Sequence, residues 1–334
     1  MCDLTNILAA RQTTLPSTKK PESRTSPHAA ILRSPHHNST PKPSSSCIQL
    51  SPDIMEIYWN LRHRLHLNSD PRHKQQASNI TVEMRSILVD WMIEVAEEYK
   101  LHLETLFLSV SYTDVCIQKL RIERSELQLL GVTCVLVAAK YEEIYAPQLS
   151  DLCYITDNSY TQSQIIAMER RVLECLEFSL TIPTTNTFMS IYLSAYFFDT
   201  EMLECATMLS KVTLVQGIAT KDPPHIIAFS VIILVCVYVR RTSASLQQMV
   251  EDFDIEYSAL HGCVRSLHDN FKSYDSVKFP AVCEHLTCHD YLQLARMTEH
   301  VELAEFVDHS STGQPLHSEL RSVSPRNADK ELVA

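Results

Sequence analysis

Apolar residues recur at helical spacing along most of the chain, from about residue 53 onward. Side chains that return every three or four residues share one face of a helix, so this pattern predicts amphipathic helices. A first set of five predicted helices covers residues 81–100, 104–120, 125–143, 147–155 and 161–176. A second set covers residues 184–197, 200–218, 224–241, 245–254 and 256–274. In each set the third helix is the most hydrophobic, which predicts two similar bundles, each with a central helix wrapped by four others.

Two more helices are predicted outside these bundles, at 55–65 and at 291–306. The expected fold is therefore all-α. It consists of a disordered Pro/Ser/Thr-rich tail, an N-terminal helix with a linker, two five-helix repeats, and a C-terminal helix with a tail. The expected bounds of these parts are 1–52, 53–80, 81–182, 183–276 and 277–334.

Ser and Thr residues mark the expected start of three helices in the first set. Thr81 stands three residues ahead of Met84, a helix-forming residue. Ser125 with Gln128, and Thr161 with Gln164, have the Ser/Thr-x-x-Gln spacing of a capping box. These pairs predict where the backbone N–H groups of the first turn find their partners.

Glycine is scarce, which narrows the function classes. The chain of 334 residues has 4 Gly, and none has a second Gly nearby. P-loops, dinucleotide-binding turns and nucleophile elbows need clustered glycines where the backbone turns sharply or meets phosphate. These site classes are therefore excluded.

Cysteine usage and the longest apolar run bear on the compartment. The 11 Cys are scattered without a CxxC pair, and the N-terminus has no secretory signal, so we expect reduced thiols inside a cell. The apolar run at 226–239 is shorter than the ~20 residues of a membrane span. We read it as a buried core helix and expect no membrane partner.

The charge is divided unevenly along the chain. Residues 1–52 hold six basic and two acidic residues, a net charge of +4. Since the whole chain has a net charge of −11, residues 53–334 have a net charge of −15. The tail also holds 7 Pro and 15 Ser/Thr, a composition that cannot bury enough apolar surface to fold alone. A folded part this acidic is a poor binder of nucleic acid, so we expect no direct nucleic-acid contact.

Three stretches of the first set resemble the cyclin family, in its mitotic A/B group. They are MRSILVDWMIEVAEEYKLHLETLFLSVSYTD (84–114), LQLLGVTCVLVAAKYEEIYAPQLSDLCYITDNSYT (127–161) and MERRVLECLEFSLTIPTTNTF (168–188). The second set is similar to the second cyclin repeat mainly through PPHIIAFSVI (223–232) and LHDNF (267–271). The resemblance implies two consecutive cyclin boxes.

The same resemblance implies a function. The implied protein is a regulatory subunit that has no catalytic activity and no cofactor of its own. It binds a cyclin-dependent Ser/Thr kinase one-to-one and activates it at G2/M or in S phase. The resemblance also implies localisation to the nucleus and cytoplasm. Two other functions are alternatives. The first is a cyclin-fold transcription-type adaptor linked to nucleic acid, which the acidic folded part disfavours. The second is a hydrolase or metalloenzyme, for which the sequence has no site.

The resemblance assigns a kinase-binding set, centred on Lys140 and Glu169. In the family these positions bind kinase backbone carbonyls, whereas spacing alone favours two ordinary surface charges. The other residues of this set are Tyr141, Glu142, Phe178 and Leu180. The family also implies an internal salt bridge between Arg85 and Asp114, a structural role.

A substrate-docking groove is the second implied site. Met84, Ile87, Leu88 and Trp91 lie on one helical face, which by itself indicates core packing. In the family this stripe is an exposed groove for Arg-x-Leu peptides of substrates and inhibitors. The remaining groove residues are Glu94, Leu127 and Gln128.

The chain departs from the family in its degradation signals. The family usually carries an RxxL or KEN sequence in its N-terminal tail, and residues 1–52 contain neither. RxxL does occur at 62–65, 124–127 and 170–173, all on predicted helices. The resemblance also implies ubiquitin-ligase machinery as a partner, but the tail contains neither of the two sequences through which such a ligase usually binds the family. The family also commonly has two prolines where this chain reads Ala146-Pro147.

Modification and metal sites complete the sequence expectations. Five Ser/Thr-Pro dipeptides are candidate phosphorylation sites: Ser26, Ser34, Thr40, Ser51 and Ser324. One cluster has ligand types that suit zinc: Cys283, His285, Cys288 and His289. Its spacing matches no standard zinc finger, so we expect no metal.

Overall fold

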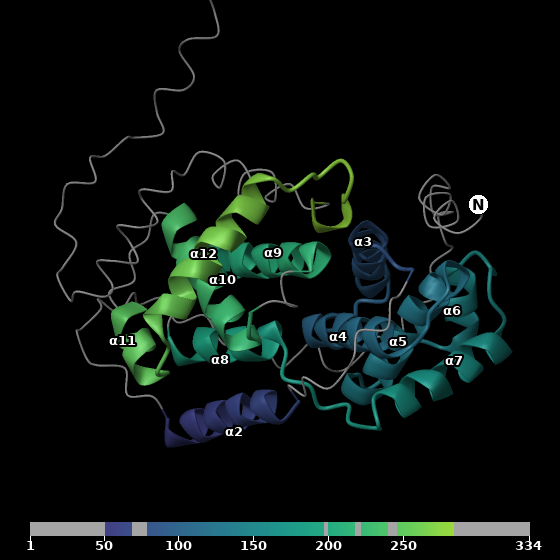
Figure 1. Ribbon diagram of the computed structural model, residues 1–334, viewed down its shortest axis with the longest axis horizontal. Coiled ribbons are helices and arrows are strands. Elements are labelled where there is room, and N and C mark those ends of the chain that lie inside the picture. Colours follow the sequence, from purple (N-terminus) through teal and green to yellow (C-terminus); the bar gives the residue numbers. More distant parts are fainter. Residues whose placement is uncertain (1–50, 69–78, 197–199, 218–221, 240–245, 284–334) are drawn as a thin grey trace, which may run out of the picture.

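The structure is a computed structural model that describes residues 51–68, 79–196, 200–217, 222–239 and 246–283 (Figure 1). Within these residues, all regular secondary structure is helical. Helix α2 spans Pro52–Asn68. The first repeat contains α3 (Val82–Glu98), α4 (Leu103–Lys119), α5 (Leu127–Glu142), α6 (Leu149–Ile155) and α7 (Gln162–Cys175). The second contains α8 (Thr185–Ala195), α9 (Thr200–Gln216), α10 (Pro224–Tyr238), α11 (Leu246–Asp252) and α12 (Tyr257–Lys272). Two 3-10 turns are also present, η2 (Arg124–Glu126) and η4 (Ala281–Cys283).

The predicted helices are confirmed to within a few residues at their ends, and the helix at 291–306 lies outside the described residues. Thr81 caps α3, since its side chain accepts from the N–H of Met84, and Thr161 forms the expected capping box with Gln164. The box expected at Ser125 is wrong. The carboxylates of Glu123 and Glu126 form a capping box at the 3-10 turn η2, and α5 itself begins at Leu127 without a side-chain cap.

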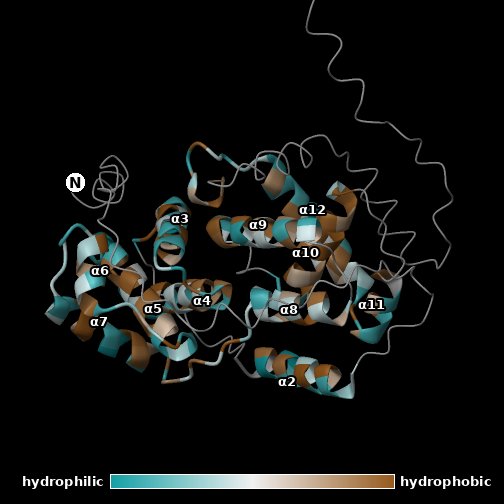
Figure 2. Ribbon diagram, turned by 180° about the vertical axis from the view of Figure 1, so that it is seen from behind, coloured by the Kyte–Doolittle hydropathy of each residue, from teal (hydrophilic) through white to brown (hydrophobic). Residues whose placement is uncertain are grey.

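The third helix of each repeat is central, as the hydrophobic pattern predicts. Every residue of α5 from Leu127 to Ala139 is buried, and α10 is buried along nearly its whole length. The apolar colouring of α10 in Figure 2 reflects this burial. Helix α5 packs on α4 and α7, and α10 packs on α8, α9 and α12.

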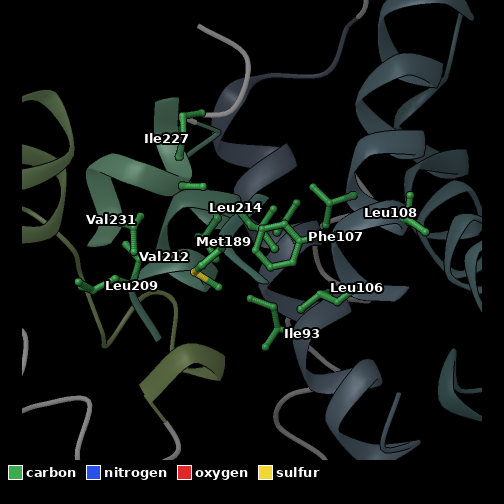
Figure 3. Close-up of a cluster of buried hydrophobic side chains, with 14 of the residues drawn as sticks. Ile93, Leu106, Phe107, Leu108, Met189, Leu209, Val212, Leu214, Ile227 and Val231 are labelled. Carbon is green, nitrogen blue, oxygen red and sulfur yellow. The ribbon is translucent and has the colours of Figure 1, made fainter. Parts of the chain in front are cut away.

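The two repeats lie side by side and share one core (Figure 1). Figure 3 shows Ile93, Leu106 and Phe107 of the first repeat gathered with Met189 and Leu214 of the second. Helix α3 stands between the repeats and contacts α4, α5, α9 and η4. The orientation of the repeats is therefore set by apolar burial, the dominant favourable term in folding.

Helix α2 precedes the first repeat in sequence but packs on the second, below α8 in Figure 1. The ring of Tyr58 is fully buried among Phe188, Tyr192 and Phe253, and its hydroxyl donates to the Phe253 carbonyl at 3.1 Å. Arg62 reinforces the contact by donating to the Asp254 carbonyl at 3.0 Å. One aromatic side chain thus anchors the N-terminal helix.

In the part of the chain that the structure describes, no helix combines the length and apolar character needed to cross a membrane. Seven of its cysteines are free thiols. Cys283 is disulfide-bonded, so the expectation of reduced thiols is wrong at this position. The remaining cysteines of the sequence, Cys2, Cys47 and Cys288, lie outside the described residues.

Candidate functional site

The end of α5 brings Lys140 against Glu169 of α7. The Lys140 Nζ lies 2.6 Å from the Glu169 Oε1. Helix α5 is buried up to Ala139, and Lys140 is its first exposed residue, with half of its side chain open to solvent. Glu169 is largely covered, at 16% exposure. An ammonium has three donor hydrogens, so Lys140 can bind Glu169 and still donate outward to a partner.

The segment after α7 is fixed beside this ion pair. The Tyr141 hydroxyl shares a hydrogen bond of 2.7 Å with the Thr181 hydroxyl. The Tyr112 hydroxyl, from α4, donates to the Leu180 carbonyl at 2.7 Å. Burial raises the pKa of Tyr112 above its ordinary value. The two tyrosines hold residues 178–181 against the end of α5.

Phe178 projects from this segment in an unusual backbone conformation. Its φ is +58°, and that of Glu177 before it is +52°, in the left-handed region that bulky residues rarely adopt. The turn is stabilised by a hydrogen bond of 3.0 Å from the Phe178 N–H to the Leu173 carbonyl. The ring itself is 70% exposed. The same pair of left-handed residues follows α6 at Asp157 and Asn158, so this geometry is that of a helix C-terminus, and the exposure of Phe178 is what marks the surface.

Two apolar residues that the sequence reasoning missed extend the same surface. Ile144 and Tyr145 follow the end of α5 and are 76% and 88% exposed. The signal for them was an apolar pair placed directly after a helix end and before Pro147. We call the whole surface the docking face; it comprises Lys140, Tyr141, Ile144, Tyr145, Glu169 and Phe178. Large exposed apolar side chains beside charged ones are typical of protein-interaction surfaces.

Comparison with known proteins identifies the family. The sequence model described as "Cyclin, N-terminal domain" matches residues 53–181, and "Cyclin, C-terminal domain" matches residues 183–300. A "Putative cyclin-A3-1" of Arabidopsis thaliana is 34% identical over 311 residues, which cover 90% of this chain and 85% of the relative. The chain belongs to the cyclin family.

Other relatives of this cyclin are also A-type. The "G2/mitotic-specific cyclin-A" of Spisula solidissima is 36% identical over 242 residues, 72% of this chain and 57% of the relative. This cyclin thus spans little more than half of that relative's length. The X-ray structure of a viral cyclin from herpesvirus saimiri has the same fold, with a TM-score of 0.58 at 22% identity, covering 66% of this chain and 99% of the viral one.

Family membership assigns the general role. Cyclins are non-catalytic regulatory subunits of protein kinases, and membership of the family gives this chain that general role. The two family domains cover the described helices of both repeats. The roles of individual residues at the docking face stay predictions.

The expected docking groove is not an exposed surface in this structure. Met84, Ile87, Leu88 and Trp91 are at most 8% exposed. The remaining groove positions, Leu127 and Gln128, are also buried, and Glu94 is partly covered. The expectation of an open groove is therefore corrected.

Close packing of α3 explains this burial. A Cβ on Gly131 of α5 would lie 2.7 Å from the Leu88 Cδ1, so α3 and α5 approach each other closely at this point. On its other sides α3 contacts α4, α9 and η4. The stripe is thus covered in the way that its helical spacing alone indicates.

The implied internal salt bridge is present. Arg85 Nε lies 2.6 Å from Asp114 Oδ1, and Nη2 lies 2.7 Å from Oδ2, so the pair is bidentate. Both side chains are at most 16% exposed. Two parallel charge-assisted bonds fix the orientation of both partners, which supports a structural role.

The remaining sequence candidates fall in several places. Ser51 is exposed directly before α2, and its carbonyl accepts from the N–H of Ile54 at 3.0 Å. The other candidate phosphorylation sites, Ser26, Ser34, Thr40 and Ser324, lie outside the described residues. So do three members of the Cys/His cluster, all but Cys283, and the described residues contain no group of side chains that could hold a metal.

Glu143 is a further residue that the sequence reasoning missed. Its side chain is only 10% exposed. Its carboxylate binds the start of α4 rather than solvent. No local pattern signals this contact, because its partners lie 38 and 41 residues away.

Proposed function

We propose that this cyclin binds a cyclin-dependent Ser/Thr kinase one-to-one through the docking face and activates it, controlling progression at G2/M or in S phase. The observation that supports the proposal most directly is the Lys140–Glu169 pair. The two atoms lie 2.6 Å apart, half of the Lys140 side chain is exposed, and the apolar side chains of the docking face are exposed as well. Isolated surface ion pairs contribute little to folding, so binding is the better account of this arrangement.

The docking face offers the chemistry that a helix-bearing partner surface requires. Lys140 donates to backbone carbonyls of the kinase, and Glu169 keeps the ammonium in place. Phe178, Ile144 and Tyr145 supply apolar area, and a few such anchors carry most of the energy of an interface. Activation follows if this surface stabilises the kinase's regulatory helix in its active position, where a Lys–Glu ion pair of the kinase is complete. A partner that binds only that conformation shifts the kinase population toward it.

Substrate recruitment and turnover are further parts of the proposal. Arg-x-Leu peptides of substrates and inhibitors would bind the α3 stripe, and a ubiquitin ligase would remove the protein. The stripe is buried in the structure, so recruitment requires α3 to become accessible. We also propose localisation to the nucleus and cytoplasm, where cell-cycle kinases act.

A reconstitution experiment tests the central proposal. The full chain is mixed with a recombinant monomeric cell-cycle cyclin-dependent kinase, and the complex mass is measured by light scattering after gel filtration. We expect a one-to-one complex and a large gain in phosphorylation of a short peptide. Arg121→Ala is the matched control, because Arg121 is an exposed cation that pairs with Glu123 and is not one of the docking-face residues. Absence of a complex with any such kinase, together with retention on DNA at low salt, would favour the nucleic-acid-linked adaptor instead.

A further inference from the structure

Glu143 connects the end of α5 to the beginning of α4. Its Oε1 accepts hydrogen bonds from the backbone N–H of His102 at 2.7 Å and from the Thr105 hydroxyl at 2.6 Å. The His102 Nε2 lies 3.6 Å from Oε2 of the same carboxylate. A single side chain at the end of one helix thus accepts hydrogen bonds from two groups at the start of another and lies beside the His102 ring.

These bonds complete the N-terminus of α4. The first N–H groups of a helix have no partner within the helix, and a side-chain cap normally accepts from one of them. His102 is the N-cap residue of α4 and makes no side-chain cap bond. Thr105 is fully buried, so its hydroxyl needs an acceptor inside the protein. Glu143 supplies the acceptor for the His102 N–H and for the Thr105 hydroxyl that the local sequence of α4 does not provide.

The backbone of Glu143 is fixed as well. Its N–H donates to the Ala139 carbonyl at 2.9 Å, which closes the last turn of α5. With both backbone and side chain bonded, Glu143 is an anchor at the point where the chain leaves the helix. Ile144 and Tyr145 follow directly and are 76% and 88% exposed. Their position depends on this anchor, because their own side chains pack little against the rest of the protein.

We infer that Glu143 is a positioning residue for kinase docking: its bonds to His102 and Thr105 hold Ile144 and Tyr145 in place on the docking face. The inference rests on the proposed function. Holding a loop in its bound conformation before association lowers the entropy lost on binding, so affinity rises without a new contact. Glu142, by contrast, is exposed and belongs to the set expected to touch the kinase directly.

Two substitutions of Glu143 separate positioning from direct contact. Glu143→Ala removes the acceptor, and we expect the kinase Kd to rise about tenfold as the loop loses its preferred position. Glu143→Gln keeps an oxygen that accepts from His102 and Thr105 while removing the charge. We expect Glu143→Gln to bind the kinase nearly as tightly as the wild type. If Glu143 instead contacts the kinase through its charge, both variants lose affinity equally and the inference is wrong.

Glu104→Ala is the matched control for loss of stability. Glu104 also lies at the start of α4, and its carboxylate accepts from Thr184, Asn186 and Thr187 of the second repeat at 2.7–2.8 Å. Its removal breaks a comparable set of bonds, and its three partners are not docking-face residues. We expect Glu104→Ala to lower the melting temperature at least as much as Glu143→Ala while leaving the kinase Kd within about twofold of wild type. If Glu104→Ala and Glu143→Ala lose the same affinity for the kinase, Glu143 contributes only to stability and the inference is wrong.

The experiment uses the full chain and the recombinant cyclin-dependent kinase described above, with the Kd measured by calorimetry on material of verified helicity. Failure of the two proposals is distinguishable. A wild-type chain that binds no kinase overturns the proposed function and this inference together. A wild-type chain that binds, with Lys140→Ala inactive and Glu143→Ala unchanged, leaves the proposed function standing and overturns the role of Glu143.

Discussion

Arg85 of the first repeat donates a hydrogen bond of 2.8 Å from Nη1 to the carbonyl oxygen of Leu214, in the last turn of α9 in the second repeat. The same guanidinium binds Asp114 of α4 through Nε and Nη2. Ser86, the next residue, donates to the Val215 carbonyl at 2.7 Å. The carbonyls at a helix C-terminus lack partners within the helix and favour positive charge. Arg85 therefore satisfies the end of α9 and joins three helices from both repeats.

Arg85→Ala should destabilise the protein by about 3 kcal/mol, because it leaves a mostly buried carboxylate at Asp114 without its partner. Urea unfolding followed by circular dichroism measures the change in the free energy of unfolding. Arg121→Ala serves as the control; its ion pair with Glu123 is exposed, and such pairs contribute at most about 1 kcal/mol. Equal effects of the two substitutions would show that Arg85 is not a structural centre.

Gly217→Ala should also weaken the junction between the repeats. Gly217 has φ +68°, and a Cβ there would lie 3.2 Å from the Arg85 Nη1. The left-handed conformation alone costs a non-glycine residue about 1–2 kcal/mol. We expect a loss of that size or larger in thermal unfolding. Gly262→Ala is the control, since nothing lies within 4 Å of its added Cβ; there, a neutral or slightly stabilising effect is expected from helix propensity.

Lys140→Ala should raise the kinase Kd about 30-fold or more, equivalent to about 2 kcal/mol, as at other interface hot spots. Glu169→Ala should act in the same direction, because it frees the ammonium from its fixed position. Neither side chain belongs to the core, so the far-ultraviolet circular dichroism spectrum and the melting temperature should stay close to wild type. Full binding and kinase activation by Lys140→Ala would show that the docking face lies elsewhere.

Leu88→Ala should reduce stability by about 3 kcal/mol, since Leu88 is fully buried and its truncation leaves a cavity beside Gly131. Chemical unfolding measures this loss. A second measurement follows phosphorylation of a long substrate with an Arg-x-Leu sequence and of a short peptide without it. If the variant keeps normal stability and loses activity only on the long substrate, Leu88 lines an open groove and not the core.

Turnover should not depend on the RxxL sequence at 62–65. Arg62 is held by the Asp254 carbonyl, and its guanidinium lies over the Trp59 ring at 5.1 Å, so the motif is part of a docked helix. A degradation receptor grips an extended peptide, and α2 would have to unfold to present one. We expect the double variant Arg62→Ala with Leu65→Ala to have no longer half-life through cell division than wild type.

Deletion of 1–52 should likewise prolong the half-life less than in a typical mitotic cyclin, because that segment contains no RxxL or KEN sequence. The half-lives are compared by pulse-chase labelling in synchronised cells. Complete stabilisation by the deletion alone would reveal a degron of another kind in the tail.

The sequence by itself determined the elements and their family. Helix spacing placed α2 through α12 because periodicity is a local property, and the long apolar stretches of α5 and α10 marked the two central helices. Thr81 and Thr161 marked helix starts for the same reason, since a cap acts within three residues. Lys140 and Glu169 were linked only through resemblance, as they stand 29 residues apart.

Tertiary structure decided which faces are open and which long-range contacts form. The spacing of the stripe from Met84 to Trp91 indicates core packing, whereas the family resemblance implies a groove; in the structure the stripe is buried, with Leu88 close against Gly131 of α5. The bond from Arg85 to Leu214 spans 129 residues, and the two bonds of Glu143 span 38 and 41. A charge or an apolar side chain has the same local sequence signature whether it meets solvent or another helix. Its role is set only when packing brings distant segments together, because the free energy of burial and pairing depends on those neighbours and not on sequence spacing.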